Sequence, residues 1–211
     1  MNRPVQTGKD SDEARARILE AAEKQFRRVG YHRTSVADIA AELGMSPANI
    51  YRFFPSRDAI NESICGRLMN EVADIAVAIA HTNAPATEKL DQLLTAVHRH
   101  NKTTSVKAKY MHDLIADATR ENWAIIKLHT ERLVTIFEAI IREGIEADEF
   151  RVEDAAEAAR AVKFAFMPFF HPILIEHCVQ HGEDTEASLR DQIGFIIKAL
   201  RQACLSRRAL G

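Results

Sequence analysis

The chain of 211 residues is long enough to bury a hydrophobic core in one large domain or two modest ones. Apolar residues make up 46% and charged residues 27%, with eight Gly and six Pro, which is typical of a helix-rich globular protein and excludes a disordered or fibrous one. Net charge is −2, and residues 1–60 hold ten Lys and Arg against eight Asp and Glu, a difference too small to indicate nucleic-acid binding by itself.

The cysteines and the apolar segments indicate the cellular compartment in which the protein is expected. Cys65, Cys178 and Cys204 lie far apart and form no C-x-x-C pair, so they predict neither a disulfide framework nor a cysteine zinc site. The N-terminus lacks the apolar run of a secretory signal. The most apolar stretch, residues 164–174, is shorter than the roughly 20 residues that a membrane-spanning helix needs. We therefore expect a cytoplasmic protein with no membrane partner.

Two helices are predicted early in the chain. Apolar residues between 18 and 29 recur at helical spacing before a glycine, which predicts the first helix. The pattern recurs over residues 36–43, with Ser35 and Asp38 placed as in a capping box at the start. Gly44 then ends this second, short helix.

A third helix is predicted to follow the second almost at once. Ser46 is a favourable N-cap, and Pro47 suits the first helical position because the N–H that proline lacks would have no partner there. The second and third helices are thus joined by a turn of a few residues that contains a glycine. This pattern is typical of a helix-turn-helix.

Six more helices are predicted after Pro55. Pro168 and Pro172 interrupt the eighth helix of the chain, where each removes a backbone hydrogen bond and should kink the helix, freeing the carbonyls of Phe164 and of Pro168 itself. The six expected ranges are 57–81, 87–101, 105–119, 122–146, 153–180 and 185–207. Because no stretch alternates apolar and polar residues for long enough to predict a strand, we expect an all-α protein of nine helices.

Residues 18–60 resemble the DNA-binding domain of the TetR (tetracycline-repressor) family of bacterial transcription regulators. The matching positions are Phe26, Gly30, Tyr31, Thr34, Ile39, Ala40, Gly44, Ser46, Ile50, Tyr51, Phe54 and Ser56. The resemblance implies a helix-turn-helix DNA-binding domain over residues 1–56, ordered from about 11, and a ligand-binding and dimerisation domain over 57–211. It also implies a homodimer formed through the eighth and ninth helices, which binds a palindromic operator, represses transcription and is released by a small-molecule effector.

The third helix carries the residues expected to contact DNA bases. Ile50 and Phe54 lie at i and i+4 and should face the core, which turns their neighbours outward. Asn49 and Arg52 are one turn apart and suit adenine and guanine edges, respectively, while Ala48 permits close approach to the major groove.

Other side chains near this helix suit phosphate oxygens. Thr34, Ser35, Tyr51 and Arg57 offer hydroxyl groups or positive charge, which position a domain on DNA without reading the sequence. We predict no role for Phe53. The predicted DNA-binding residues are Thr34, Ser35, Ser46, Pro47, Ala48, Asn49, Tyr51, Arg52 and Arg57.

An effector pocket is expected in the C-terminal part of the chain, as the resemblance implies. Its candidate lining residues are Met69, Met111, Trp123, Phe137, Phe166, Phe170 and His171. Each has a structural alternative, because methionine and aromatic residues on helical stripes belong to the core more often than to a pocket.

The sequence also contains residues that bear on a metal site and on an enzymatic site. His177 and His181 lie at i and i+4, next to Cys178, and could hold Zn²⁺ or Cu²⁺ if Glu176 or His171 supplied a third ligand. Such pairs usually face solvent, so we predict no metal and no cofactor. No G-x-S-x-G, H-E-x-x-H or phosphate-binding glycine loop occurs, which argues against an enzyme. The alternative to a ligand-responsive regulator is a metal-sensing regulator, or a helical dimeric protein that binds no DNA.

Overall fold

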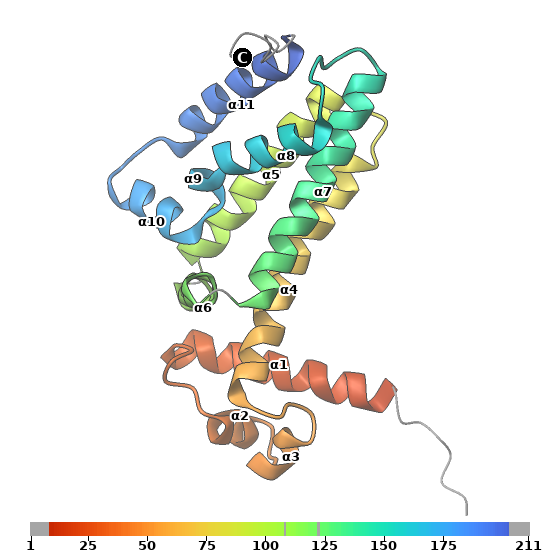
Figure 1. Ribbon diagram of the computed structural model, residues 1–211. Helices are drawn as coiled ribbons and strands as arrows, with labels where there is room; N and C mark the ends of the chain where they lie inside the picture. The colour runs from red at the N-terminus through yellow and green to blue at the C-terminus, as the bar shows by residue number, and fades with distance from the viewer. Residues whose placement is uncertain (1–8, 108, 122, 203–211) are drawn as a thin grey trace, which may run out of the picture. The chain divides into compact units, whose positions relative to one another are not determined.

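The computed structural model describes residues 9–107, 109–121 and 123–202, and all regular structure within these ranges is helical (Figure 1). The predicted all-α class is therefore confirmed. The helices belong to two compact units, one of residues up to 68 together with 108–125, and one of residues 69–107 together with 126 onward. We call them the first and the second unit and describe each separately.

The first unit holds the predicted helix-turn-helix. It comprises α1 (Lys9–Val29), α2 (Val36–Glu42), α3 (Pro47–Tyr51), the start of α4 (Arg57–Ala80) and α6 (Lys109–Arg120). Helix α1 packs against both α2 and α6, and α2 packs against α3. The fully buried large side chains of this unit include Ile18, Phe26, Ile39, Ile50, Phe54, Ile60 and Ile64. They include Ile50 and Phe54, as the helical spacing predicted.

Local sequence explains both ends of α2. The predicted capping box is present, because the Ser35 hydroxyl accepts from the Asp38 N–H and the Asp38 carboxylate accepts from the Ser35 N–H. At the other end Gly44 adopts a φ of +64°, and Met45 and Gly44 donate to the carbonyls of Ala40 and Ala41. This is a Schellman motif, which glycine favours because a positive φ strains residues with a Cβ. The chain thereby turns directly into Ser46, the N-cap of α3.

The second unit consists of α5 (Ala86–Lys107), most of α7 (Ala124–Glu146), α8 (Ala155–Ala165), α9 (Met167–Phe170), α10 (Pro172–Gln180), α11 (Thr185–Arg201) and the later part of α4. Helix α5 packs against α9, α10 and α11, and α11 also packs against α8 and α10. The core includes Leu90, Leu93, Phe137, Phe150 and Phe166, all fully buried. The predicted end of the last helix, near residue 207, lies outside the described residues.

The predicted eighth helix is a series of three helices, so the described residues form eleven helices rather than nine. Pro168 lies in the first turn of α9, and Pro172 begins α10. His171, between them, is extended, which frees the carbonyls of the residues before it. The His98 Nδ1 lies 3.0 Å from the Phe169 carbonyl oxygen, and Asn101 donates to the Phe170 carbonyl at 3.2 Å. Polar side chains of α5 thus provide hydrogen-bond partners for the carbonyl groups that the break between α9 and α10 leaves without helical partners.

None of the described helices combines the length and the apolar character that a membrane span requires.

Candidate nucleic-acid interface

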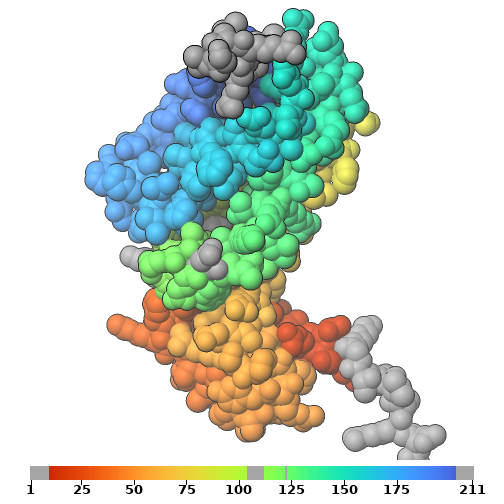
Figure 2. All heavy atoms as spheres, viewed as in Figure 1, coloured from red at the N-terminus to blue at the C-terminus, as the bar shows by residue number. Residues whose placement is uncertain are grey.

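Helix α3 presents a small outward face above two buried anchors. Ile50 is fully buried and Phe54 nearly so, which fixes the rotation of the helix about its axis. Pro47 and Ala48 are exposed as a result, and half of the Tyr51 side chain remains in contact with solvent. In the space-filling view, α3 and the start of α4, drawn in orange, form one continuous outer surface of the first unit (Figure 2). A short helix with small residues at its start can enter a major groove about 12 Å wide.

Asn49 and Arg52 lie side by side on this face. The Arg52 Nη1 is 3.4 Å from the Asn49 Oδ1, so the amide and the guanidinium group occupy one patch one helical turn apart. Arg52 is exposed, and Asn49 is partly exposed. Asparagine can bond adenine, and arginine can bond guanine, each through two hydrogen bonds in the major groove. The pair therefore presents hydrogen-bonding groups that suit base edges on one solvent-exposed patch.

Ser35 and Ser46 are exposed caps at the starts of α2 and α3. The Ser35 hydroxyl lies 2.6 Å from the Asp38 carboxylate, and the Ser35 side chain and backbone hydrogen bonds hold the pKa of Asp38 below its usual value. The Ser46 hydroxyl oxygen accepts from the Asn49 N–H at 3.3 Å, so its own hydrogen can still be donated to a phosphate. Both serines lie at helix N-termini, where backbone N–H groups favour anions.

Thr34 differs from its predicted role. Its side chain is 1% exposed, and its hydroxyl donates to the Gly30 carbonyl at 2.9 Å. Because the hydroxyl is buried and bonded, it closes the turn after α1 rather than facing a phosphate. Thr34 thus matches the family pattern at a position where its hydroxyl closes a turn. The sequence alone did not distinguish this structural role from a contact with DNA.

Arg57 is also tied into the fold. Its Nη2 donates to the Tyr31 carbonyl at 2.6 Å and approaches the His32 carbonyl at 3.4 Å, joining the start of α4 to the loop between α1 and α2. The side chain is half-buried. Arg57 therefore has a bracing role that the sequence did not predict, and its role at phosphate stays a prediction.

Arg15 is a residue of this site that the sequence did not single out. Its Nη1 donates to the Phe53 carbonyl, and its guanidinium group lies 4.2 Å from the centre of the Phe54 ring. Helix α1 thereby holds the segment that follows α3. The half-buried Phe53, for which no role was predicted, contributes its carbonyl to this contact.

A second unpredicted cluster joins the loop after α1 to α6. The buried Tyr31 donates its hydroxyl to Asp117, which also pairs with Arg120 and lies 3.1 Å from the His32 Nε2. Burial raises the pKa of Tyr31, and the hydrogen bond to Asp117 raises it further. Burial alone would raise the pKa of Asp117, but the hydrogen bonds from Tyr31 and Arg120 outweigh it and leave that pKa below its usual value. The cluster fixes α6 against the loop between α1 and α2.

The seven residues predicted to line an effector pocket occur in both units. Phe137 and Phe166 are fully buried in the core of the second unit, where the Phe166 ring lies 6.1 Å from that of Phe170. Met69 and His171 are half-buried there, with His171 preceding α10. These five share the second unit.

Trp123 and Met111 belong to the first unit. Trp123 is half-buried, and its Nε1 donates to Glu121 at 2.9 Å. Met111 lies on α6, and its side chain is outside the described part of the structure. The tertiary structure therefore assigns the seven candidates to two separate groups.

Two family models match the chain. Residues 18–64 match the model of bacterial regulatory proteins of the TetR family, and residues 86–189 match the tetracyclin repressor-like C-terminal domain. Together they cover more than two thirds of the chain. The chain is also similar to the uncharacterized HTH-type transcriptional regulator YhgD of Bacillus subtilis (strain 168). The two sequences are 22% identical over 87% of this chain and 94% of the relative.

Solved structures of similar fold include a TetR-family transcriptional regulator from Pectobacterium atrosepticum. It superposes with a TM-score of 0.67 at 18% identity, covering 96% of this chain and all of that one. A complex of SmeT with triclosan superposes with a TM-score of 0.65 at 16% identity, covering 89% and 91% of the two chains. These likenesses show the shared fold. With both family models in chain order on that fold, the chain belongs to the TetR family of transcription regulators and is not an enzyme.

Proposed function

We propose that this helix-turn-helix regulator is a repressor that binds a palindromic operator as a homodimer and is released by a small-molecule effector. The DNA-binding domain is residues 1–56, and residues 57–211 bind the effector and the second subunit. The observation that carries the proposal is the face of α3, where exposed Pro47, Ala48, Tyr51 and Arg52 surround the buried Ile50. We propose a cytoplasmic location, because a regulator must be in the same compartment as its operator DNA.

The side chains of the interface divide into two roles. Asn49 and Arg52 read base edges in the major groove, because they lie together on the outward face of α3. Tyr51 and Ser46 bind phosphates and set the position of the domain on the duplex, whereas the Ser35 hydroxyl donates to the Asp38 carboxylate. Pro47 and Ala48 allow the helix to approach closely.

Two exposed phenylalanines support a homodimer through the predicted eighth and ninth helices, which correspond to α8–α10 and α11. Phe164 on α8 is 63% exposed and Phe195 on α11 is 67% exposed, and these two helices pack against each other. Ile173 and Leu174 on α10 are exposed as well. Exposed aromatic rings of this size are favourable to bury, and a second copy of the chain would bury them symmetrically.

The effector site is proposed for the second unit, from Met69, Phe170 and His171, which are only half-buried. A small-molecule effector is consistent with the complex of SmeT with triclosan, a protein of similar fold. Phe137 and Phe166 contribute to such a site from the core, through which an effector could act on helix packing.

The decisive experiment is a binding titration against duplex DNA at several salt concentrations. We expect affinity to fall steeply as salt rises, because phosphate contacts release counterions. Selection from a random duplex pool should then yield a palindrome with half-sites about 34–36 Å, or one helical turn, apart. Failure to bind duplex DNA even at low salt would exclude the proposed function.

A further inference from the structure

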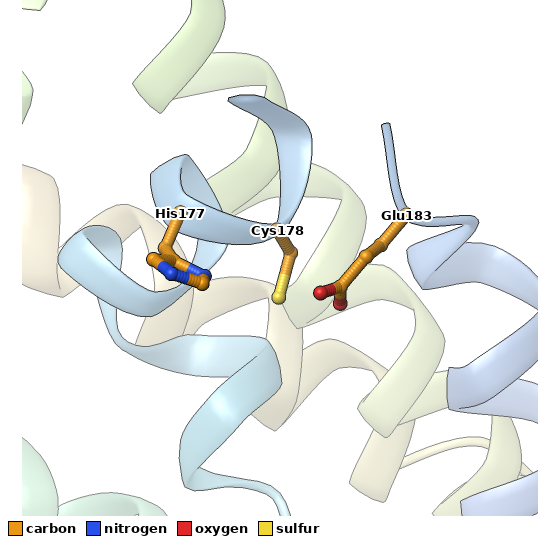
Figure 3. A group of neighbouring side chains, drawn as sticks. All are labelled: His177, Cys178 and Glu183. Carbon is orange, nitrogen blue, oxygen red and sulfur yellow. The ribbon is translucent and has the colours of Figure 1, made fainter. Parts of the chain in front are cut away.

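Three potential metal ligands meet where α10 ends. The His177 ring, the Cys178 Sγ and the Glu183 carboxylate each offer a ligand atom, and these atoms lie within 4.8 Å of one another. Figure 3 shows the Glu183 carboxylate pointing toward the Cys178 sulfur, which lies between the carboxylate and the His177 ring. His177 and Glu183 are exposed and Cys178 is partly exposed, so an ion can reach all three from solvent.

Backbone geometry explains why residues five apart in the chain meet. Gly182 adopts a φ of +70° after the last turn of α10, and the N–H groups of Glu183 and Gly182 donate to the carbonyls of Cys178 and Val179. This is a second Schellman motif, in which the residue after the glycine folds back over the last turn. The two positions that it brings together usually carry apolar side chains. Here they are a thiol and a carboxylate.

The position of Glu183 is also restrained from the other side. Its carbonyl accepts from the N–H of Thr185, the buried first residue of α11. The Thr185 hydroxyl lies 2.9 Å from the Lys102 Nζ and 3.2 Å from the His98 Nε2, both on α5. The turn that carries Glu183 is therefore anchored to the core of the second unit, which lowers the entropic cost of assembling a site.

We propose that His177, Cys178 and Glu183 form a zinc-binding site at the turn between α10 and α11. Imidazole, thiolate and carboxylate are the three side-chain ligands that Zn²⁺ takes in proteins. With metal–ligand bonds of about 2.0–2.3 Å, a tetrahedral ion would hold its ligand atoms about 3.3–3.8 Å apart. Side-chain rotations that move the ligand atoms by about 1 Å would therefore bring them to the distances that the ion requires. Three protein ligands leave the fourth position to water or to a donor atom of an effector.

His181, which the sequence pairs with His177, is excluded from this ligand set. Its Nδ1 lies 2.8 Å from the His177 carbonyl oxygen, and its ring is stacked on the His177 ring with centroids 4.1 Å apart. The site therefore differs from the His177–His181 clamp by using Cys178 and Glu183 instead of the second histidine.

The site is tested by titrating the full-length protein with Zn²⁺ in competition with a chromogenic chelator. We expect one high-affinity ion per chain and at least about tenfold weaker binding for Cys178→Ser, Glu183→Gln and His177→Gln, since each removes one ligand. With Co²⁺ as the probe, a thiolate-to-metal charge-transfer band should appear in the wild type and disappear in Cys178→Ser.

Controls make the result specific to these ligands. His181→Gln should bind Zn²⁺ within about twofold of the wild type, and Cys204→Ser should keep the Co²⁺ band. Circular dichroism verifies that each variant is folded, which is expected for the substitutions at residues 177, 178, 181 and 183 because these side chains reach solvent. Wild-type protein that fails to compete for Zn²⁺, or a Cys178→Ser variant that keeps the affinity and the band, would overturn the proposal. Loss of binding in His181→Gln would also overturn the assigned ligand set. None of these outcomes depends on DNA binding.

Discussion

The Arg57 guanidinium on the first turn of α4 donates to the carbonyl oxygen of Tyr31, 26 positions earlier, at 2.6 Å. This hydrogen bond fastens the loop before α2 to the helix that follows α3. Helix α3 thus lies in the chain between two segments that are held together. Arg57 consequently has a structural task as well as its expected task at phosphate.

Replacing Arg57 with alanine should destabilise the first unit. A hydrogen bond from a charged group contributes about 1.5–3 kcal/mol, so we expect a loss in that range in the free energy of unfolding. Trp123, the single tryptophan of the chain, lies in the first unit, and its fluorescence during urea titration measures the change. Arg33→Ala, at an exposed position in the same loop, is the matched control. An equally stable Arg57→Ala protein would rule out the bracing role.

Substitutions on α3 should separate base reading from phosphate binding. Asn49→Ala and Arg52→Ala remove base-edge contacts, so each should lose about 1–3 kcal/mol on the preferred operator and much less on unrelated duplexes. Tyr51→Phe removes only a hydroxyl and should weaken binding to all sequences alike. Fluorescence anisotropy with a panel of labelled duplexes measures both effects. A uniform loss across the panel for all three variants would contradict the division of roles.

Placing a charge at Phe195 should dissociate the homodimer. The ring is 67% exposed, so Phe195→Glu leaves the fold of the subunit intact while it puts an unpaired charge into the proposed interface. Sedimentation velocity should show a shift from dimer to monomer at micromolar concentration. Leu128→Glu is the matched control, because Leu128 is 62% exposed on α7, outside the proposed interface. If only the control variant dissociates, the interface lies elsewhere.

The second unit should lose stability in mild acid through His129. Burial, followed by repulsion from Arg132, lowers the pKa of His129 from 6.5 to about 4. Between these values the unfolded chain binds a proton that the folded chain does not. The stabilising contribution is therefore complete above pH 6.5 and is lost as the pH falls toward 4.

Urea unfolding followed by circular dichroism measures this dependence. The free energy of unfolding should decline less between pH 6.5 and 4 in His129→Gln than in the wild type, because the variant has no imidazole to protonate. His81→Gln, at an exposed position in the same unit, should follow the wild type. Identical pH profiles for the wild type and His129→Gln would show that the buried imidazole is not responsible.

Local signals in the sequence were sufficient to predict the helix-turn-helix. Ser35 with Asp38, and Ser46 with Pro47, act on backbone groups within three residues of themselves, so their effect does not depend on the rest of the fold. The breaks at Pro168 and Pro172 were predictable for the same reason, since proline lacks the N–H that a continuous helix requires. The spacing of Ile50 and Phe54 then determined which side of α3 faces outward.

Contacts between distant residues were decided only by the tertiary structure. Tyr31 and Asp117 are 86 positions apart, and Arg15 and Phe53 are 38 apart, so no local pattern links either pair. A threonine that binds phosphate and one that closes a turn look alike in sequence, and only the burial of Thr34 separates them.

The sequence by itself thus determined where α2 and α3 begin and which face of α3 is exposed, because caps, prolines and apolar spacing act over a few residues. The tertiary structure decided which polar side chains hold the interface together and which remain available to a ligand. These two outcomes depend on packing. Packing brings together groups that lie far apart in the chain, and their separation in the sequence does not predict their distance in space.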